Sequence, residues 1–256
     1  MKRVMKLIRK ISGSAVLIVL GLSSAYQVFA QQYVVSENVP AHIREAVESN
    51  NRSAEDTARD VNRFPAELLT LADLNVGDRV IELSALGQYY STIMVDAVGP
   101  YGNVYMYDLV AFEGFGAEGG NAFAAANANA QYHLANYDTA DYPSGVDAAY
   151  LILGYHDLEA RDNDPSAMNA NLFASLKPGG KFVVVDHSAE SGSGWRDAAN
   201  LHRIGKEVVI DEVTAAGFEL ISDSSLLSRP ENDRTASTFS MNGTTDRFVL
   251  VFQKPY

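Results

Sequence analysis

The chain has 256 residues, of which 47% are hydrophobic and 20% are charged, and its formal net charge is −12. These proportions are those of a globular protein with a full core, so they exclude a chain that is disordered throughout. The sequence contains no cysteine, which excludes disulfides, thiolate nucleophiles and metal sites built on cysteine.

Residues 1–30 have the pattern of a secretory signal peptide. Residues 1–10 carry five cations and no acid, residues 14–22 form a short apolar run, and Ala30 ends a small-residue cleavage site before Gln31. An apolar run of this length is too short to span a bilayer. We therefore expect cleavage after Ala30 and a periplasmic or secreted protein, with an uncleaved N-terminal anchor as the alternative.

The mature protein is predicted to be strongly acidic. Loss of the five N-terminal cations lowers the formal net charge from −12 to −17. Such a protein is not expected to bind nucleic acid or an anionic membrane surface. We predict a small-molecule substrate as its partner, no nucleic acid, and no stable membrane insertion once the signal peptide is removed. The oligomeric state is left open.

Residues 31–64 form a polar, helical lead-in to one domain over residues 65–256. Pro40 suits the first turn of one helix, and Ser53 suits the N-cap of a second. We expect a pair of surface helices here. Pro65 then opens a further helix, after which a turn leads into the first strand.

Beyond residue 65, strands alternate with helices, which is the pattern of an α/β protein with a doubly wound, mostly parallel sheet. The predicted strands are 78–83, 102–108, 133–138, 146–157 and 181–187. The predicted helices after residue 84 are 89–99, 121–131, 167–176 and 206–218. The last two extended segments, 219–225 and 247–255, suit a C-terminal antiparallel hairpin at the sheet edge.

Six segments carry a resemblance to a known family: VIELSALGQYYS, GNVYMYD, YLILGYHD, LKPGGKFVVVDH, LHRIGKEVVIDEVTAAGFEL and TTDRFVLVFQKP. In this order they resemble the class I S-adenosylmethionine-dependent methyltransferases, most closely the predicted secreted or periplasmic branch. The resemblance covers about residues 63–256. It implies a Rossmann-like sheet, S-adenosylmethionine as cofactor, and methyl transfer to a small molecule that is not identified.

Ligands of such sheets lie outside the carboxyl ends of the strands. By the resemblance, Asp108 at the end of the second strand would accept the hydroxyls of the cofactor ribose. Glu82 would support the loop backbone and the methionine portion. Further cofactor contacts are expected from Ser84, Gly87 and Asp138. For Asp108 the alternative is a strand-end acid that caps the next turn.

The turn that should contact the cofactor, residues 84–88, holds a single glycine. The related enzymes typically have glycines at the positions of Ser84, Leu86 and Gln88. Ser84 is small enough for a close turn, and Gly87 can supply a positive φ angle. The side chains of Leu86 and Gln88 either project into the cofactor space or turn away with the loop redrawn. We predict that the fold is kept and that the cofactor loop is atypical.

Methyl transfer requires alignment of the reactants and, for some nucleophiles, removal of a proton. The candidate bases are His156 and His187, which are expected to close neighbouring strands. Asp186 and Asp157 are positioned to orient them. The alternative is that these histidines only make structural hydrogen bonds.

Three further features have two interpretations each. His202 and Arg203 are either a substrate-binding pair or a polar cluster at a helix entry. Trp195 is either a lid or an anchor for its loop, and the long connection 227–247 is either functional or held by its own charges.

His156, His187 and His202 lack the HxH or HxxxH spacing of a metal site, so no metal is predicted.

The predicted function is therefore an exported methyltransferase that acts on a small molecule. The alternative is a non-catalytic small-molecule-binding protein on the same fold, because the loop is poor in glycine and the cofactor must be supplied outside the cytoplasm. A hydrolase is disfavoured, because the sequence contains no GxSxG motif.

Overall fold

The computed structural model describes residues 33–241 and 243–256, and residues 32–256 form one compact unit. The predicted signal peptide and its cleavage site lie outside the described residues. Within the described ranges, no helix combines the length and the apolar character needed to cross a membrane.

A seven-stranded sheet with the order β3-β2-β1-β4-β5-β7-β6 forms the centre of this unit. The strands are β1 Arg79–Leu83, β2 Asn103–Asp108, β3 Ala130–Leu134, β4 Val146–Ile152, β5 Leu176–His187, β6 Glu219–Ser224 and β7 Arg247–Gln253. The first five are parallel, and β7 runs antiparallel to both β5 and β6. The predicted α/β fold, a doubly wound, mostly parallel sheet with a C-terminal antiparallel hairpin, is confirmed.

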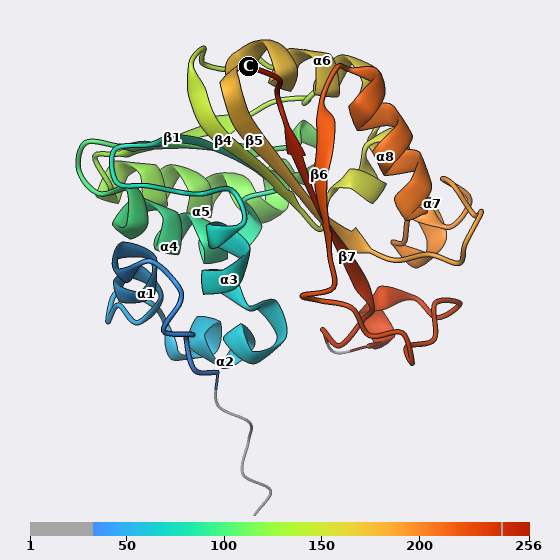
Figure 1. The fold of residues 1–256 in the computed structure, drawn as a ribbon, viewed down its shortest axis with the longest axis horizontal. Helices are drawn as coiled ribbons and strands as arrows, with labels where there is room; N and C mark the ends of the chain where they lie inside the picture. Colours follow the sequence, from blue (N-terminus) through green and yellow to red (C-terminus); the bar gives the residue numbers. More distant parts are fainter. Residues whose placement is uncertain (1–32, 242) are drawn as a thin grey trace, which may run out of the picture. The chain divides into compact units, whose positions relative to one another are not determined.

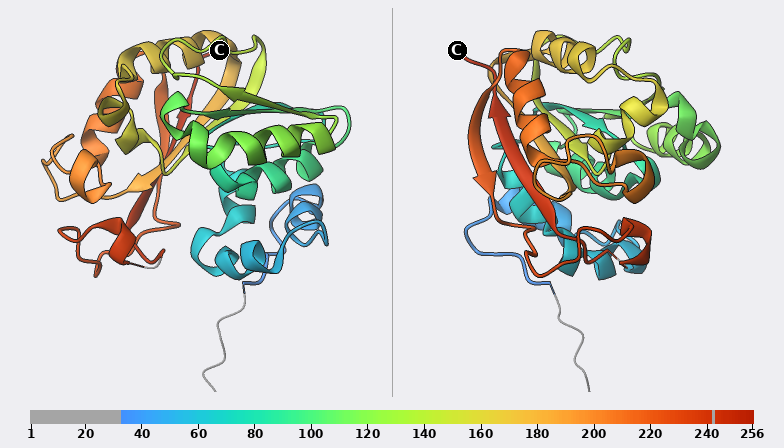
Figure 2. Two further views of the ribbon diagram at one scale, coloured as in Figure 1. Left: turned by 180° about the vertical axis from the view of Figure 1, so that it is seen from behind. Right: turned by 90° about the vertical axis from the view of Figure 1, so that its right-hand side faces the viewer.

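Both faces of the sheet are covered, which is why its central strands are apolar throughout. Val80 of β1 belongs to one core cluster and the next residue, Ile81, to the other, as the alternation of side chains along a strand requires. Helices α4 (Tyr89–Val98) and α5 (Glu113–Ala126) lie on the first face. Helices α6 (Pro165–Ser175) and α8 (Lys206–Ala215) lie on the other (Figures 1 and 2).

The N-terminal helices differ in part from the expected surface pair. Helix α1 (Ala41–Val47) buries Ile43 and Val47 in the core cluster that α4 also joins, so it is a packed element. Helix α2 (Ala54–Arg63) is polar, and Ser53 caps it by accepting a hydrogen bond from the Asp56 backbone N–H at 3.0 Å. The short α3 (Pro65–Thr70) opens on Pro65, as predicted.

The segment between β2 and β4 differs most from the prediction. Helix α5 covers 113–126 instead of 121–131, and β3 begins at Ala130, three residues before the predicted strand. The helix includes a glycine-rich stretch that comes very close to its neighbours: a Cβ atom on Gly120 would lie 2.2 Å from the ring of Tyr132. The glycines permit this close packing, and local helix propensity does not predict it.

Candidate functional site

A pocket of about 420 Å³ lies beyond the carboxyl ends of β4 and β5, and we call it the His156 pocket. Its apolar walls are formed by Leu86, Phe112, Phe115, Leu153 and Phe239. Its polar groups are those of His156, Asp157, Arg161, His187, His202 and Thr238. The volume is in the range of sites for small molecules, and apolar walls with a few convergent polar groups are typical of such sites.

His156 reaches the pocket because it lies in a turn after β4. The predicted strand, 146–157, included His156, but β4 is shorter. The strand stops at Ile152, Leu153 has a left-handed φ of 59°, and residues 155–157 form a short 3-10 helix. The backbone N–H of His156 then donates to Asp186 Oδ2 at 2.9 Å, and its Nδ1 lies 2.7 Å from Asp186 Oδ1. The turn after β4 thus places His156 against the end of β5.

Asp186 fixes the imidazole of His156. The carboxylate is fully buried and also accepts the backbone N–H of His187. Burial lowers the pKa of His156, but the charge and hydrogen bond of Asp186 outweigh this and raise it above its usual value. Burial alone would raise the pKa of Asp186, but the charge and hydrogen bond of His156 outweigh burial. The pKa of Asp186 is therefore lowered. The carboxylate therefore keeps a proton on Nδ1, and Nε2 is directed away from Asp186.

Two further polar atoms lie beside His156 Nε2. His202 Nδ1 is 3.2 Å from it, and Asp157 Oδ2 is 3.5 Å from it. His202 follows helix α7 (Ala198–Leu201) with a left-handed φ of 54°, and its ring packs edge-on against Phe239. The structure therefore gathers His156, Asp157 and His202, although His202 is 46 residues from His156 in the chain.

His187, the second predicted base, also lines the pocket. Its Nδ1 is 2.7 Å from Thr245 Oγ1, and burial lowers its pKa to about 3. Its ring is therefore neutral at physiological pH and a weak base.

The predicted cofactor residues lie in a different environment. Glu82 is 3% exposed and accepts a hydrogen bond from Ser91 Oγ of α4 at 2.5 Å. Burial raises its pKa to about 8, so it is largely protonated at neutral pH. Asp138 accepts the backbone N–H of Asp164 at the start of α6, and neither it nor Glu82 is among the pocket residues.

Asp108 is covered by α5 and by the loop. It is fully buried, and Tyr132 donates to its Oδ2 at 3.1 Å. A Cβ atom on Gly116 of α5 would lie 2.5 Å from Leu86 Cδ2 and 2.7 Å from Asp108 Oδ2. Burial raises the pKa of Asp108 to about 6, although Tyr132 and the backbone N–H groups of Ala85 and Leu86, which face the carboxylate, act to lower it. The carboxylate that would hold a ribose is thus closed off.

The side chains of Leu86 and Gln88 in the loop 84–88 lie against helix α5. Ser84, Gly87 and Gln88 have positive φ angles of 63°, 74° and 53°. The Ser84 N–H donates to the Tyr137 hydroxyl at 2.8 Å, and the Gln88 amide lies against Gly119 of α5. Leu86 likewise projects toward α5. As they stand, these residues do not fit S-adenosylmethionine, because side chains and α5 fill the space around Asp108.

The structure settles the two interpretations of Arg203 and Trp195 in favour of structural roles. Arg203 is fully buried, and its guanidinium donates to the carbonyls of Ser188, Asp233 and Ala236. It thereby holds the long 227–247 connection, whose Phe239 lines the His156 pocket. Trp195 donates to Glu212 at 2.9 Å and stacks on Tyr155, so it anchors its loop.

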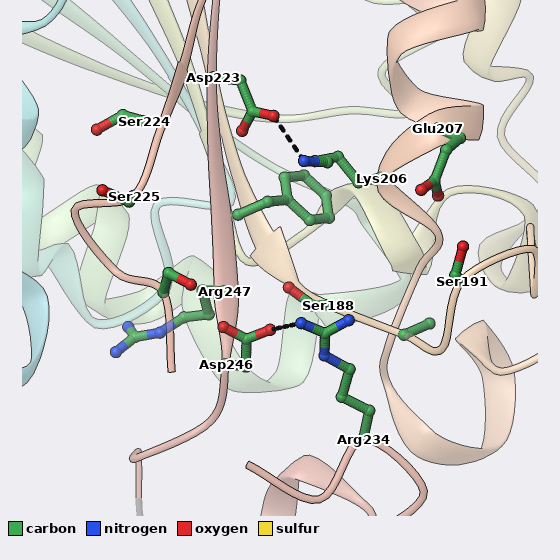
Figure 3. A pocket seen from close by; sticks show the side chains of 13 residues that line it. Ser188, Ser191, Lys206, Glu207, Asp223, Ser224, Ser225, Arg234, Asp246 and Arg247 are labelled. Atoms are coloured by element: carbon green, nitrogen blue, oxygen red, sulfur yellow. Dashed lines mark hydrogen bonds and ion pairs between the residues drawn. The ribbon is translucent and has the colours of Figure 1, made fainter. Parts of the chain in front are cut away.

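A second cavity of about 370 Å³ lies beside β6 and β7 and is mainly polar (Figure 3). Four of its charged groups form two ion pairs: Lys206 with Asp223 and Arg234 with Asp246, each at 2.6 Å. These pairs neutralise the four residues, while Glu207 and Arg247 also line the cavity.

No protein-family model matches the chain, and no curated protein matches it. Solved structures do. A SAM-dependent methyltransferase from Aquifex aeolicus has a TM-score of 0.56 at 16% identity, over 77% of this chain and 92% of that one. The pyocyanin biosynthetic protein PhzM has a TM-score of 0.53 at 16% identity, over 77% and 56% of the two chains. The [4+2]-cyclase SpnF has a TM-score of 0.53 at 17% identity, over 81% and 84%.

These similarities show that the chain has the Rossmann-like fold of class I SAM-dependent methyltransferases. At such low identity they show the fold alone. The cyclase among them also illustrates that one fold supports different reactions, so the function has to be argued from the site.

Proposed function

We propose that the protein is an exported enzyme that binds an amphipathic small molecule in the His156 pocket and acts on it at the polar end. The observation that carries this proposal is the convergence of His156, Asp157 and His202 at one end of a pocket with apolar walls. Convergent titratable groups in a concave site are the usual mark of an active site. Export is included because of the signal-peptide pattern of residues 1–30.

The mouth of the pocket supports an apolar portion in the ligand. Phe115 is 86% exposed and Phe239 is 78% exposed, and both line the pocket. Exposed apolar side chains that share a pocket are typical of a binding site that a ligand covers. The net charge of −12 disfavours a polyanionic ligand.

S-adenosylmethionine-dependent methyl transfer to a small molecule is the second candidate. It is favoured by the fold and by Asp108, a carboxylate at the end of β2 that a ribose could contact. It requires Leu86 and α5 to move off Asp108 when the cofactor binds. Its predicted cofactor residues Glu82, Ser84, Gly87, Asp108 and Asp138 stay a prediction, as do the catalytic roles of His156, His187 and Asp186.

Untargeted mass spectrometry of a small-molecule extract from the producing culture separates these functions. The extract is incubated with the protein, with and without added S-adenosylmethionine, and compared with His202→Asn and with His42→Gln as the control outside the pocket. Consumption of a compound without the cofactor, lost in His202→Asn and kept in His42→Gln, supports the leading proposal. Consumption that needs the cofactor and gives a product heavier by one methyl group supports the second. Retention of a compound without consumption supports the non-catalytic binding protein.

A further inference from the structure

Three potential metal ligands converge at the end of the His156 pocket. His156 Nε2, one carboxylate oxygen of Asp157 and His202 Nδ1 all lie within 4.8 Å of one another. We propose that these three atoms bind one divalent transition-metal ion, with the rest of its coordination sphere open to the pocket. Two imidazoles and one carboxylate suit zinc or iron(II).

The spacing of the two imidazole nitrogens matches such an ion. Metal–nitrogen and metal–oxygen bonds of about 2.0–2.2 Å, at angles between those of an octahedron and a tetrahedron, place neighbouring ligand atoms about 3.0–3.5 Å apart. His156 Nε2 is 3.2 Å from His202 Nδ1 and 3.5 Å from Asp157 Oδ2. The other carboxylate oxygen of Asp157, Oδ1, is 3.9 Å from His202 Nδ1. The two distances from Asp157 therefore involve different oxygens, and the carboxylate has to turn so that one oxygen faces both imidazoles when the ion binds.

Asp186 provides the outer support that metal-binding histidines usually have. Its Oδ1 is 2.7 Å from Nδ1 of His156, and its Oδ2 accepts the His156 backbone N–H at 2.9 Å. This holds the proton on Nδ1 and leaves the lone pair of Nε2 for the ion, as in carboxylate–histidine–metal arrangements.

His202 is placed beside His156 by the end of helix α7. Its φ of 54° lies in the left-handed region, which often ends a helix and in which histidine is enriched among non-glycine residues. Nδ1 of His202 lies 3.2 Å from Nε2 of His156, and Phe239 packs edge-on against the His202 ring.

The open coordination positions of the ion indicate which polar group the bound small molecule carries. This inference about the ligand rests on the proposed function. A bound molecule would place an oxygen atom, from a carboxylate or a hydroxyl, on the ion. Its apolar portion would contact Leu86, Phe115 and Phe239. The alternative without an ion is a direct hydrogen bond between His156 and His202.

The test is a titration of the full protein, as purified from the producing cells and stripped with a chelator. Zn²⁺ binding is measured by calorimetry, and Co²⁺ is added separately to record the visible absorption that its coordination gives. We expect one equivalent of either ion. His202→Asn should weaken Zn²⁺ binding at least tenfold and change the Co²⁺ spectrum, and Asp157→Asn should do the same. Asparagine tolerates the left-handed backbone, so His202→Asn preserves the turn. His42→Gln is the matched control.

Failure to bind either ion would overturn the proposal, as would Zn²⁺ affinity in His202→Asn equal to that of His42→Gln. Circular dichroism of each variant shows that it is folded, and Asp157→Asn provides the same comparison should His202→Asn not fold. Failure of the metal proposal can be distinguished from failure of the proposed function. Metal binding without consumption of any extract compound keeps the site and rejects the enzyme. Consumption by the stripped protein that is lost in His202→Asn, with no binding of Zn²⁺ or Co²⁺, keeps the enzyme and rejects the metal.

Discussion

Nδ1 of His156, in the turn after β4, lies 2.7 Å from Oδ1 of Asp186 near the end of β5, although the two residues are 30 residues apart. Asp186 is fully buried and donates nothing while it is ionised, so it determines which imidazole nitrogen carries the proton. The orientation of Nε2 toward His202 and Asp157 follows from this one contact.

Asp186→Asn should therefore change the tautomer of His156. The amide of asparagine can donate to Nδ1, which moves the imidazole proton to Nε2 and removes the lone pair from the pocket. Nitrogen chemical shifts of the ring report this change. We expect Zn²⁺ affinity to fall about 10- to 100-fold, the usual effect of losing an outer carboxylate, and unfolding free energy to fall by about 1–3 kcal/mol. An unchanged tautomer in a folded variant would contradict this account.

Glu82 should make the protein less stable as the pH rises. Its folded-state pKa is about 8 against a usual 4.5, so the folded protein retains a proton that the unfolded chain loses. The stabilisation is complete below pH 4.5 and is lost progressively up to about pH 8, at most about 1.4 kcal/mol per pH unit. Urea denaturation between pH 5 and 8.5 measures this slope.

Glu82→Gln should flatten that slope and raise the stability at pH 8 relative to the wild type. Glutamine keeps a hydrogen bond with Ser91 and carries no charge to desolvate. The variant should still lose some stability as the pH rises toward 6, because the pKa of Asp108 is about 6. This remaining slope of unfolding free energy against pH should be smaller than that of the wild type. Glu45→Gln, at an exposed acid of α1, is the control and should keep the wild-type slope. A slope that is equal in Glu82→Gln and Glu45→Gln would show that Glu82 is ionised in the folded protein.

Export predicts a defined N-terminus. Intact-mass analysis of the protein from the periplasm or medium should give a chain that begins at Gln31. Ala30→Glu should accumulate the uncleaved precursor, because the cleavage site requires a small residue. Full-length wild-type protein in the cytoplasm would reject the signal peptide, and full-length protein in the membrane fraction would support the anchor alternative.

The central strands were predictable from the sequence because they are buried on both faces and read as uninterrupted apolar runs, as in Val146–Ile152. The α5 region was not, since its helix depends on Gly116 and Gly120 packing closely on residues remote in sequence. The partnership of His156 with His202 was not predictable either. It depends on a left-handed turn after α7, and the sequence carries no spacing signal for it.

The loop from Ser84 to Gln88 decides whether this fold still binds S-adenosylmethionine. Leu86 and α5 cover Asp108, so calorimetry on the wild-type protein should show no binding, or binding much weaker than that of the variant below.

Leu86→Gly with Gln88→Gly removes the side chains that lie against Gly116 and Gly119, which opens a path to the carboxylate of Asp108. We expect the double variant to bind S-adenosylmethionine at least tenfold more tightly than the wild type, which is the gain for about one charge-assisted hydrogen bond. Adding Asp108→Ala to it should abolish that gain. Binding by the wild type as tight as by the double variant would show that the loop opens by itself, and it would move methyl transfer from the second candidate to the first.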